Sequence, residues 1–397
     1  MPERRALVIG GGVGGLTAAV ALHRRGWRVT VLERAADLEP VGAGIGLAPN
    51  AQRALDTVGL GDEIRALAAW QGDGGLRTPA GRWLARTSGE ALAARYGGPM
   101  VLLHRATLLD RILTRLPDDA VRTGTAARVT DPGTAGGRPA VVAVGDAEEE
   151  ADLVVGADGI HSGVRRFLFP AHPGPRYSGF TSWRVVVPGL PGGIQPHETW
   201  GPGRIWGSQP MKDGRIYAYA AALAPAGTRA PDEKAELLRR YGDWHDPIPA
   251  LVAAAAPDGV LRHDVHHLTD PLPAFHRGRT VLIGDAAHAM APTLGQGGNQ
   301  AIEDAVVLAH HCAPDTDQGA ALAAYTADRL PRTTAVVRKA ARLCRIQSLG
   351  AGPAVALREN LIALAARLGP GAALRGFDGI ADWRPPGRTY ADRTRNG

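Results

Sequence analysis

The sequence predicts an α/β protein in which a parallel βαβ core is interrupted by an inserted, mostly antiparallel β-sheet and followed by C-terminal helices. Three observations predict this fold class. A glycine-rich turn at residues 10–15 joins a short apolar strand to helix-like sequence. Residues 177–276 contain alternating, aromatic-bearing strand patterns such as FTSWRVVV and GRIYAYAAAL. Residues 318–368 are rich in Ala and Leu at helical spacing.

Composition narrows the class of protein. The chain has 397 residues, of which 45% are hydrophobic and 21% charged, which is typical of a globular protein with two or three domains. The formal net charge is +6, but the basic residues are mostly Arg and are spread along the chain, so we expect no nucleic-acid partner. No window reaches about 18 uninterrupted apolar residues, so we expect no membrane span. Cys312 and Cys344 lie in apolar runs, which predicts buried thiols, no disulfide framework and a cytoplasmic protein.

The first strand, helix and second strand form a unit that predicts dinucleotide binding. They occupy residues 6–9, 14–25 and 27–32. Glycines spaced as G-x-G-x-x-G permit a tight turn and let the backbone approach a pyrophosphate, which then faces the N-terminus of the helix. An acidic residue about 20 positions further on can bond a ribose hydroxyl. The cofactor-binding residues predicted in this unit are Gly10, Gly12, Val13, Gly14, Gly15, Glu33 and Arg34.

The continuation favours FAD over NAD as the dinucleotide. An NAD-dependent dehydrogenase would proceed to another βαβ repeat, whereas here the glycine-rich loop and helix VGAGIGLAPNAQRAL follow at residues 41–55. This loop is expected to lie along the far end of a longer ligand, with Gly46 as a candidate contact. The helical pattern of residues 102–113 then begins near Arg105. Arg105 is a candidate cofactor contact, and a solvated cation at a helix end is the alternative.

A second motif, at residues 154–166, combines an apolar strand, a turn and a helix start. The turn contains Gly159, and glycine tolerates backbone conformations that other residues avoid. Ser162 is expected to cap the helix that Val164 opens. A purely structural strand-to-helix turn is the alternative interpretation.

A third motif, GDAAHAMAPTLGQGGNQAIED at residues 284–304, follows an apolar strand at residues 280–283. Asp285 is therefore expected at the carboxyl end of a strand, where open α/β sheets bind ligands. Asn299 leads into a helix whose N-terminal amides can stabilise negative charge on a reduced flavin. The glycines that let the backbone approach the flat ring of such a ligand are Gly295, Gly297 and Gly298.

Together these motifs resemble those of the single-component FAD-dependent aromatic hydroxylases, the class A flavoprotein monooxygenases that include salicylate, 3-hydroxybenzoate and p-hydroxybenzoate hydroxylases. The resemblance covers about residues 4–345 and rests on GGGVGG with Glu33, on VVGADGIHSGVRR and on VLIGDAAHAMAPTLGQGGNQAIEDA. It implies a Rossmann-like FAD-binding domain of the glutathione-reductase type. It also implies FAD as the cofactor and NADPH or NADH as a transient co-substrate.

The resemblance assigns roles to single residues of the second and third motifs. Asp158 is expected to support the FAD side, and Arg165 is a candidate for contact with the nicotinamide cofactor. Asp285 is expected to bond the ribityl chain of FAD, and Pro292 is expected near the isoalloxazine, where it stiffens the loop. The cofactor site implied at the third motif is completed by Gly295, Gly297, Gly298 and Asn299.

The antiparallel sheet is predicted to cover the flavin, with the substrate between them, because ligand pockets favour domain interfaces. Strand alternation puts Tyr217 and Tyr219 on one face of this sheet. The candidate wall residues, each with simple sheet core as the alternative, are Trp183, Arg184, Trp206, Tyr217 and Tyr219. The candidate catalytic residues are Arg184, Tyr217, Pro292 and Gly295.

The predicted units are discontinuous in the sequence, because the sheet-forming stretches separate the cofactor motifs. The FAD-binding domain is expected to comprise residues 1–70, 101–176 and 277–345. The substrate-binding sheet domain is expected to comprise residues 71–100 and 177–276, and the C-terminal helical segment and tail residues 346–397.

Other polar residues are given less specific interpretations. The spacing of His, Cys and carboxylate residues matches no zinc ligand set, so we expect no metal site. His288 is expected to pack near the cofactor or on a helix surface. Glu303 and Asp304 are either a paired general acid and base or a solvated or Arg-paired helix face.

The function predicted from these observations is that of an FAD-dependent monooxygenase. Such an enzyme uses NADPH or NADH and molecular oxygen to hydroxylate an aromatic or other electron-rich small molecule through a C4a-hydroperoxyflavin. The alternatives are an epoxidase or a reductase acting on a natural-product intermediate, and a non-catalytic flavin- or nucleotide-binding protein. The substrate, its regiochemistry, NADH versus NADPH, and a monomer versus a homodimer are left open.

Overall fold

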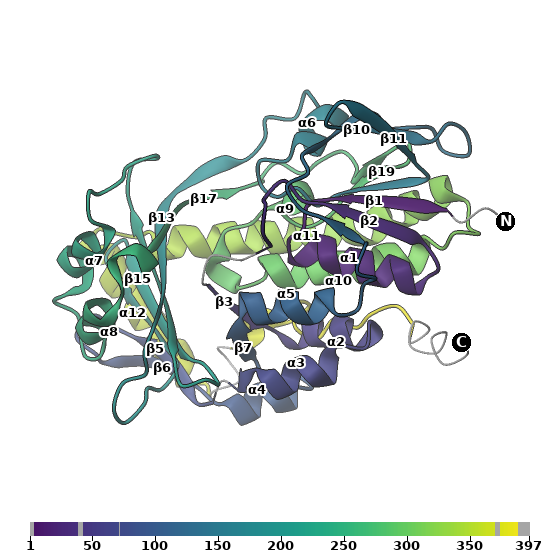
Figure 1. Cartoon of the computed structure of the whole chain (residues 1–397). Helices are drawn as coiled ribbons and strands as arrows, with labels where there is room; N and C mark the ends of the chain where they lie inside the picture. Colours follow the sequence, from purple (N-terminus) through teal and green to yellow (C-terminus); the bar gives the residue numbers. More distant parts are fainter. Residues whose placement is uncertain (1–3, 39–42, 71, 370–373, 388–397) are drawn as a thin grey trace.

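The structure is a computed structural model that describes residues 4–38, 43–70, 72–369 and 374–387. It is a mixed α/β fold with a six-stranded and a seven-stranded sheet as its largest sheets. In Figure 1 the six-stranded sheet lies at the right and the seven-stranded sheet at the left, with helices beside both.

The six-stranded sheet has the order β18-β19-β12-β1-β2-β8, and its neighbouring strands are parallel except for the pair β18 and β19. Its strands are β1 (Arg5–Ile9), β2 (Arg28–Leu32), β8 (Val121–Arg122), β12 (Leu153–Gly156), β18 (His276–Arg277) and β19 (Thr280–Leu282). The strands predicted at the three motifs are therefore confirmed. Because β1, β12 and β19 are adjacent and parallel, the motifs that follow them meet at one edge of the sheet.

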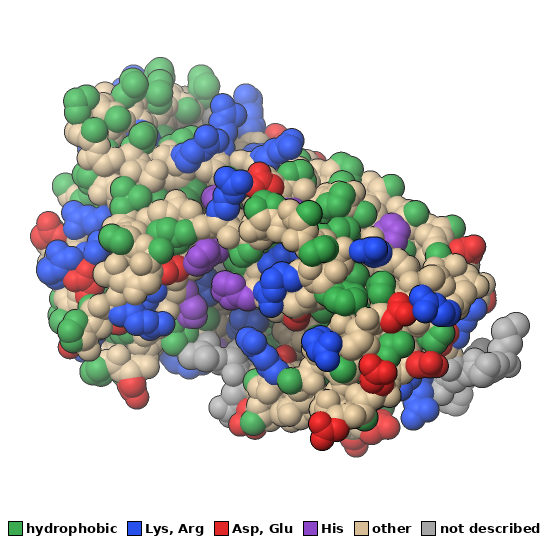
Figure 2. All heavy atoms as spheres, turned by 90° about the horizontal axis from the view of Figure 1, so that it is seen from above, with side chains coloured by type: hydrophobic (Ala, Val, Ile, Leu, Met, Phe, Trp, Pro, Cys, Tyr) green, Lys and Arg blue, Asp and Glu red, His purple; other side chains and the backbone are tan. Residues whose placement is uncertain are grey.

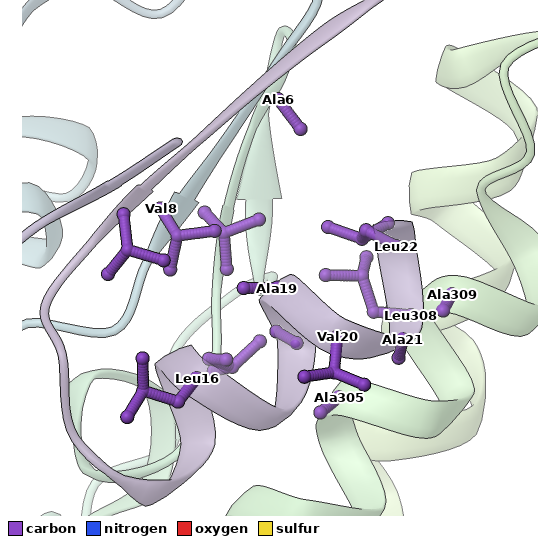
Figure 3. Close-up of a cluster of buried hydrophobic side chains, with 14 of the residues drawn as sticks. Ala6, Val8, Leu16, Ala19, Val20, Ala21, Leu22, Ala305, Leu308 and Ala309 are labelled. Atoms are coloured by element: carbon purple, nitrogen blue, oxygen red, sulfur yellow. The ribbon is translucent and has the colours of Figure 1, made fainter. Parts of the chain in front are cut away.

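The core of this half forms where α1 (Val13–Arg24) packs between β1 and α10 (Gly297–His311). Figure 3 shows Leu22 of α1 beside Leu308 of α10, and both side chains are fully buried. Each such burial contributes about 1.5–3 kcal/mol to stability. The helices approach closely because α1 is rich in small residues, and a Cβ added at Gly14 would lie 3.0 Å from the Cβ of Ala301.

The seven-stranded sheet has the order β17-β13-β16-β15-β14-β5-β6 and is antiparallel except for the pair β14 and β5. Its strands are β5 (Gly74–Arg77), β6 (Trp83–Thr87), β13 (Arg176–Val187), β14 (His197–Gly201), β15 (Arg204–Pro210), β16 (Ile216–Leu223) and β17 (Leu261–His267). The prediction of a mostly antiparallel sheet in this part of the chain is confirmed.

One face of this sheet, the outer face, packs against α7 (Glu233–Tyr241) and α8 (Ile248–Ala254). Trp183 and Trp206 lie on this face and are buried among residues of those helices. The prediction that these tryptophans line a substrate site is therefore wrong, because their strand positions point them away from the cofactor motifs. Sheet core, the alternative interpretation, is what the structure shows.

Two three-stranded sheets and further helices complete the described fold. One small sheet consists of β3 (Gly44–Leu47), β7 (Val101–His104) and β4 (Ala69–Trp70), and the other of β11 (Ala147–Ala151), β10 (Ala140–Val144) and β9 (Ala127–Asp131). The remaining helices are α2 (Pro49–Thr57), α3 (Gly61–Leu67), α4 (Gly89–Tyr96), α5 (Arg105–Leu113), α6 (Gly163–Leu168), α9 (Asp285–His288), α11 (Gln318–Gln347) and α12 (Gly352–Ala366). Short 3-10 turns are η1 (Pro257–Gly259), η2 (Pro292–Leu294) and η3 (Arg375–Phe377).

Helix α11 contacts both large sheets. The hydroxyl of Tyr325 donates to the carbonyl of Leu282 in β19 at 3.1 Å. Near the other end of the helix, Cys344 is buried beside Phe180 and Trp200 of the seven-stranded sheet. The long helix therefore holds the two halves together, and the helices predicted in residues 318–368 are confirmed.

The predicted division into domains stays a prediction. The strands of the seven-stranded sheet come from residues 74–87 and 176–267. Helix α4, placed by the prediction in the sheet domain, packs through Tyr96 against Leu374 and Ala381 of the C-terminal segment. Among the described residues, no helix is both long and apolar enough to cross a membrane.

Candidate active site

The glycine turn after β1 is built by close backbone contacts. Gly10 has φ of +114°, and a Cβ there would lie 2.4 Å from the carbonyl oxygen of Ala157. A Cβ at Gly15 would lie 2.0 Å from the carbonyl oxygen of Gly10. At Gly12, by contrast, the nearest atom to such a Cβ is a guanidinium nitrogen of Arg105, 3.8 Å away. The turn is thus closed where it packs on the protein and open where a ligand would lie.

Glu33 lies beside this turn, at the end of β2. Its carboxylate accepts hydrogen bonds from the backbone N–H of Gly11 at 2.6 Å and of Ala35 at 2.8 Å. The side chain is partly exposed, and its neighbour Arg34 is exposed. The predicted contact of Glu33 with a ribose hydroxyl is compatible with this position, and the roles of both residues stay predictions.

Arg105 begins α5 and reaches the open side of the glycine turn. Its Nε is buried and has no hydrogen-bond partner among the described residues. Desolvation lowers the pKa of Arg105 below its usual range, the charge of Arg184 lowers it further, and the carboxylate of Asp285 opposes this effect. A half-buried cation with a free donor, 3.8 Å from an open glycine position, fits the pyrophosphate of FAD better than it fits a solvated helix end.

The loops predicted to surround the flavin are joined by the side chain of Asn299. Its amide nitrogen donates to the carbonyl of Gly46 at 3.0 Å and to that of Gly295 at 2.6 Å. Its amide oxygen accepts from the backbone N–H of Ala48 at 2.8 Å. The sequence placed Asn299 at the start of a helix and among the cofactor-binding residues, and that role stays a prediction. In the structure its side chain is buried and fixes β3 against the loop of the third motif.

These two segments, residues 44–48 and 292–299, are called the flavin cradle, and they leave room for a flat ligand. A Cβ added at Gly46 or at Gly295 would meet no atom within 4 Å, and Gly295 has φ of +61°. Pro292 and Gly295 are both exposed on the same loop. At Gly298 the nearest contact is the side chain of Ile45, at 3.0 Å. The open glycines on facing segments fit a flavin ring between β3 and the start of α10.

Replacing Asn299 with Ala is expected to loosen this cradle. The substitution removes the hydrogen bonds of the side chain to Gly46, Gly295 and Ala48, each of which contributes about 0.5–1.5 kcal/mol to stability. We expect weaker FAD retention and a lower unfolding midpoint, measured by flavin fluorescence titration and thermal unfolding. Asn299→Asp keeps the acceptor for Ala48 but places a carboxylate oxygen against the carbonyl oxygens of Gly46 and Gly295, so its effect should be at least as large. Wild-type FAD affinity in both variants would show that the hydrogen bonds do not hold the cradle.

Asp285 follows Gly284, whose φ is +58°, at the carboxyl end of the sheet. Its Oδ1 lies 3.9 Å from the position of a Cβ on Gly297. Desolvation by the surrounding protein raises the pKa of Asp285, and the positive charges of His288 and Arg105 oppose this rise. The residue is exposed to solvent. An accessible carboxylate between the glycine turn and the flavin cradle is well placed for hydroxyls of a ribityl chain.

The carboxylate of Asp158 faces the N-terminus of α6. It accepts from the hydroxyl of Ser162 at 2.5 Å and from the backbone N–H of Gly163 at 2.7 Å. The hydroxyl of Ser162 in turn accepts from the N–H of Arg165 at 2.8 Å, which confirms the predicted cap. The predicted role of Asp158 in supporting bound FAD stays a prediction. Within the protein, the carboxylate of Asp158 orders the start of α6.

Arg165 is buried, with 2% of its surface exposed. Its guanidinium donates to the carbonyl of Ala286 at 3.0 Å and to that of Ile160 at 2.6 Å. The side chain therefore joins the second motif to the third. The predicted contact of Arg165 with the nicotinamide cofactor stays a prediction, and in this conformation the guanidinium faces protein carbonyls.

Glu303 and Asp304 belong to a buried ionic network behind the third motif. Arg329 donates to Glu303 at 2.5 Å and to Asp304 at 2.7 Å, and these three side chains are at most 1% exposed. Asp304 also accepts from the backbone N–H of Gly284 at 2.8 Å and contacts His288 at 2.5 Å. The Arg-paired interpretation is confirmed, but the helix face is buried rather than solvated. Despite desolvation, the surrounding charges and hydrogen bonds lower the pKa of Asp304 to about 2, which does not suit a general acid or base near neutral pH.

The inner face of the seven-stranded sheet, opposite the face that packs on α7 and α8, carries polar side chains. Arg184, Tyr219, Gly207 and Glu198 are cross-strand partners in one row, so their side chains share this face. The ring of Tyr217, on the same face, packs against Gly44 of β3, where an added Cβ would lie 2.6 Å from the ring. The inner face is therefore turned toward the flavin cradle.

Arg184, Tyr217 and Tyr219, three of the candidate wall residues, lie on this face, whereas the sequence analysis missed Glu198. The strand sequence HETWG places an acidic residue at a position that alternates with His197 and Thr199. An acidic residue within a strand was a usable signal, because a carboxylate rarely points into a core. In the face drawn in Figure 2, blue Lys or Arg and purple His side chains gather toward the middle of the molecule.

The fold and the site define a flavoprotein oxidoreductase, and comparison with known proteins agrees. A family model described as an FAD binding domain matches residues 3–340. The chain belongs to this family of FAD-binding proteins.

Known relatives resemble the chain over most of its length. Aurachin C monooxygenase/isomerase of Stigmatella aurantiaca is 39% identical, with 90% of this chain and 93% of that protein covered. The 3-amino-4-hydroxybenzoate 2-monooxygenase PtmB3 of Streptomyces platensis is 37% identical, with 94% and 96% covered. The crystal structure of Klebsiella pneumoniae HpxO with FAD and uric acid superimposes with a TM-score of 0.86 at 30% identity, covering 96% of both chains.

These findings confirm the fold class, FAD as the cofactor and the enzyme class predicted from the sequence. The protein is an FAD-dependent monooxygenase, and NADPH or NADH is the co-substrate typical of such enzymes. The cofactor site built from the glycine turn, Arg105, Asp285 and the Asn299 cradle fits this class. The individual roles of the site residues stay predictions.

Proposed function

We propose that the protein hydroxylates a small electron-rich aromatic or heteroaromatic ring held between the flavin cradle and the inner face of the seven-stranded sheet. The observation that carries this proposal is the row of Arg184, Tyr219 and Glu198 on the face turned toward Gly44 and Gly46. Bound FAD supplies the redox chemistry, by accepting hydride from a nicotinamide and activating oxygen. The chain binds and orients both reactants and excludes water.

The charges on the inner face suit a ring with different groups on opposite edges. Arg184 lies on β13 and Glu198 on β14, three strand spacings away, which is about 14 Å between backbones. Tyr217 and Tyr219 lie between them with their ring centroids 5.8 Å apart. An acceptor or anionic group of the substrate would face Arg184, while aromatic side chains pack on the ring. The relatives named for an aminohydroxybenzoate and crystallised with uric acid support ring substrates of this size.

The start of α10 contributes to the electrostatics of the site. The helix runs for 15 residues from Gly297, and its first N–H groups have no partners within the helix. They are directed toward the end at which the flavin cradle lies, and their partial positive charge stabilises an anionic ring. Arg105, Arg184 and the exposed Asp285 set the remaining charges around the cofactor site.

The proposed function is tested by the reaction of the reduced enzyme with oxygen. The holoenzyme is reduced anaerobically with NADPH or with NADH, which also determines the preferred co-substrate. It is then mixed rapidly with oxygenated buffer while flavin absorbance is followed. A transient band before reoxidation, together with hydroxylated product from a panel of phenols and heteroaromatic rings, supports the proposal. Direct reoxidation with full release of hydrogen peroxide in the presence of every ring compound would favour a reductase instead.

Replacing Asp285 with Ala is expected to weaken FAD binding by at least tenfold, because the accessible carboxylate at the ribityl position is lost. Asp285→Asn, which keeps a hydrogen-bonding side chain, should be affected less. The measurement is equilibrium FAD binding by flavin fluorescence, with Asp118→Ala as a matched control because Asp118 is exposed and follows the C-terminal end of α5. Full FAD occupancy in Asp285→Ala would contradict the placement of the ribityl chain.

The proposal also covers the location of the protein and its oligomeric state. A cytoplasmic location is supported by Cys312 and Cys344, which are free and buried. The molecule is proposed to act as a monomer or a homodimer on a small-molecule substrate with molecular oxygen. Size-exclusion chromatography with light scattering distinguishes the two assemblies.

A further inference from the structure

We infer that a C-terminal strap, residues 374–384, holds the flavin cradle from behind, with Ile380 as a positioning residue for the flavin-dependent reaction. Ile380 touches neither cofactor nor substrate in this role, and it acts through the loop at residues 290–297. The inference goes beyond the proposed function, because it concerns how the chain holds the loop that borders the flavin, whichever ring compound is hydroxylated.

The loop at residues 290–297 has both exposed and buried positions. Pro292 and Gly295 are exposed, whereas Leu294 is only 7% exposed and Gln296 is fully buried. The regular structure between them is the single turn η2, and a turn this short has little stability of its own. The contacts of its buried side chains therefore decide where the exposed residues of the loop lie.

The strap supplies part of these buried contacts. Ile380 is 4% exposed and belongs to one apolar cluster with Met290 and Leu294 of the loop. The other buried members of this cluster, all on α11, are Val336, Val337 and Ala340. The loop therefore packs on α11 and on the strap together. Shortening the side chain of Ile380 would leave a cavity in this cluster, which the loop can fill only by moving.

A chain of hydrogen bonds joins the strap to the same loop by a separate route. The guanidinium of Arg332 donates to the carbonyl of Ile380 at 3.1 Å and to the carboxylate of Glu303 at 2.7 Å. The side-chain amide of Asn50 donates to Glu303 at 2.6 Å and to the side chain of Gln296 at 3.1 Å. Asn50, Glu303 and Gln296 are fully buried, so protein rather than water surrounds these bonds and their geometry is closely fixed.

Arginines outside the loop fasten the strap to the rest of the fold. Arg53 of α2 donates to the carbonyl of Trp383 at 2.8 Å and also to that of Ala381. Arg95 of α4 donates to the carboxylate of Asp378 at 2.8 Å. The bonds of Arg53 go to backbone carbonyls, so they fix the path of the strap whatever side chains it carries. A shortened apolar side chain in the strap should therefore leave the strap backbone in place.

The first test compares Ile380→Ala with Leu374→Ala in hydrogen exchange of the full-length apoprotein. Leu374 is the matched control, because it is a strap residue with 3% exposure that belongs to a different apolar cluster, with Tyr96 of α4. We expect the backbone amides of residues 290–297 to exchange about fivefold faster or more in Ile380→Ala, and at the wild-type rate in Leu374→Ala. Ile380→Val, which keeps most of the side chain, should restore exchange to within about twofold of wild type.

The second test measures FAD binding by fluorescence titration and by visible circular dichroism of the bound flavin. We expect the dissociation constant of FAD to rise about fivefold or more in Ile380→Ala and by less than about twofold in Leu374→Ala, with an altered dichroism spectrum only in the former. A role in overall stability alone would affect both variants alike. Arg53→Met serves if Ile380→Ala does not fold, because it loosens the strap without changing the apolar cluster. It should likewise speed exchange in the loop and weaken FAD binding.

Equal loop exchange and equal FAD affinity in Ile380→Ala and Leu374→Ala would overturn the inference, and so would faster loop exchange without any loss of FAD affinity. No ring compound enters either measurement, so failure of the proposed function leaves both tests intact. An enzyme that hydroxylates rings while Ile380→Ala leaves the loop unchanged keeps the proposed function and loses only the role of the strap.

Discussion

Replacement of Arg329 by Met is expected to destabilise the protein by about 3–5 kcal/mol, the typical cost of leaving a buried carboxylate without its partner. Arg329 is fully buried and bonds both Glu303 and Asp304. Arg332 still pairs with Glu303 in the variant, at 2.7 Å, whereas Asp304 keeps only His288 and the N–H of Gly284. Because Asp304 holds the backbone before Asp285, FAD retention should fall as well.

The measurement is urea unfolding of the apoprotein, followed by FAD binding to the folded variant. Arg338→Met on the same helix is the matched control, because Arg338 is exposed. The folded-state pKa of Asp304, about 2, lies below its usual range, so the stability that this carboxylate contributes is present above about pH 4 and is lost as the pH falls toward 2. A loss below about 1 kcal/mol in Arg329→Met would show that the network is not needed for stability.

Replacement of Gly15 by Ala is expected to abolish FAD binding at micromolar concentrations and to lower the stability of the apoprotein. The new Cβ would lie 2.0 Å from the carbonyl oxygen of Gly10 and 3.1 Å from the Cβ of Ala157. The backbone of the turn has to move to relieve this overlap, and overpacking of this kind costs about 1–3 kcal/mol. The glycine turn would then no longer present its backbone to the pyrophosphate.

Gly12→Ala separates ligand contact from folding and serves as the comparison. A Cβ at Gly12 has no protein atom closer than 3.8 Å, so the apoprotein should unfold at the wild-type midpoint. FAD binding should nevertheless weaken, because the methyl group occupies the side of the turn that faces Arg105. Thermal unfolding without FAD and fluorescence titration with FAD measure the two effects. Equal loss of apoprotein stability in Gly12→Ala and Gly15→Ala would contradict this distinction.

The cofactor half of the molecule could be predicted from the sequence because its chemistry depends on short motifs. Glycine spacing, an apolar strand before each motif and Asp285 after a strand are local features, and adjacent parallel strands bring them together. The side chain of Asn299 was harder to interpret. Its hydrogen bonds reach Gly46 and Ala48 across about 250 residues of sequence, which no local pattern reveals.

The substrate half could be predicted only in part. Alternation correctly placed Tyr217 and Tyr219 on one face, but it cannot tell which face meets another layer of the fold. Trp183 and Trp206 were therefore assigned to the wrong face, and α7 and α8 cover them. The hydrogen bond that Tyr219 donates to Glu198 depends on the register of three strands and on the absence of a side chain at Gly207.

The path of the chain through the two large sheets limits how the protein can be rearranged. The seven-stranded sheet takes β5 and β6 from residues 74–87 and its other strands from residues 176–267, with strands of the six-stranded sheet between them in sequence. The parallel pairing of β14 with β5 joins the two contributions. A single cut cannot release either half as a complete module. Exchange of substrate specificity between relatives therefore requires both segments to be transplanted together, with the contacts of α11 preserved.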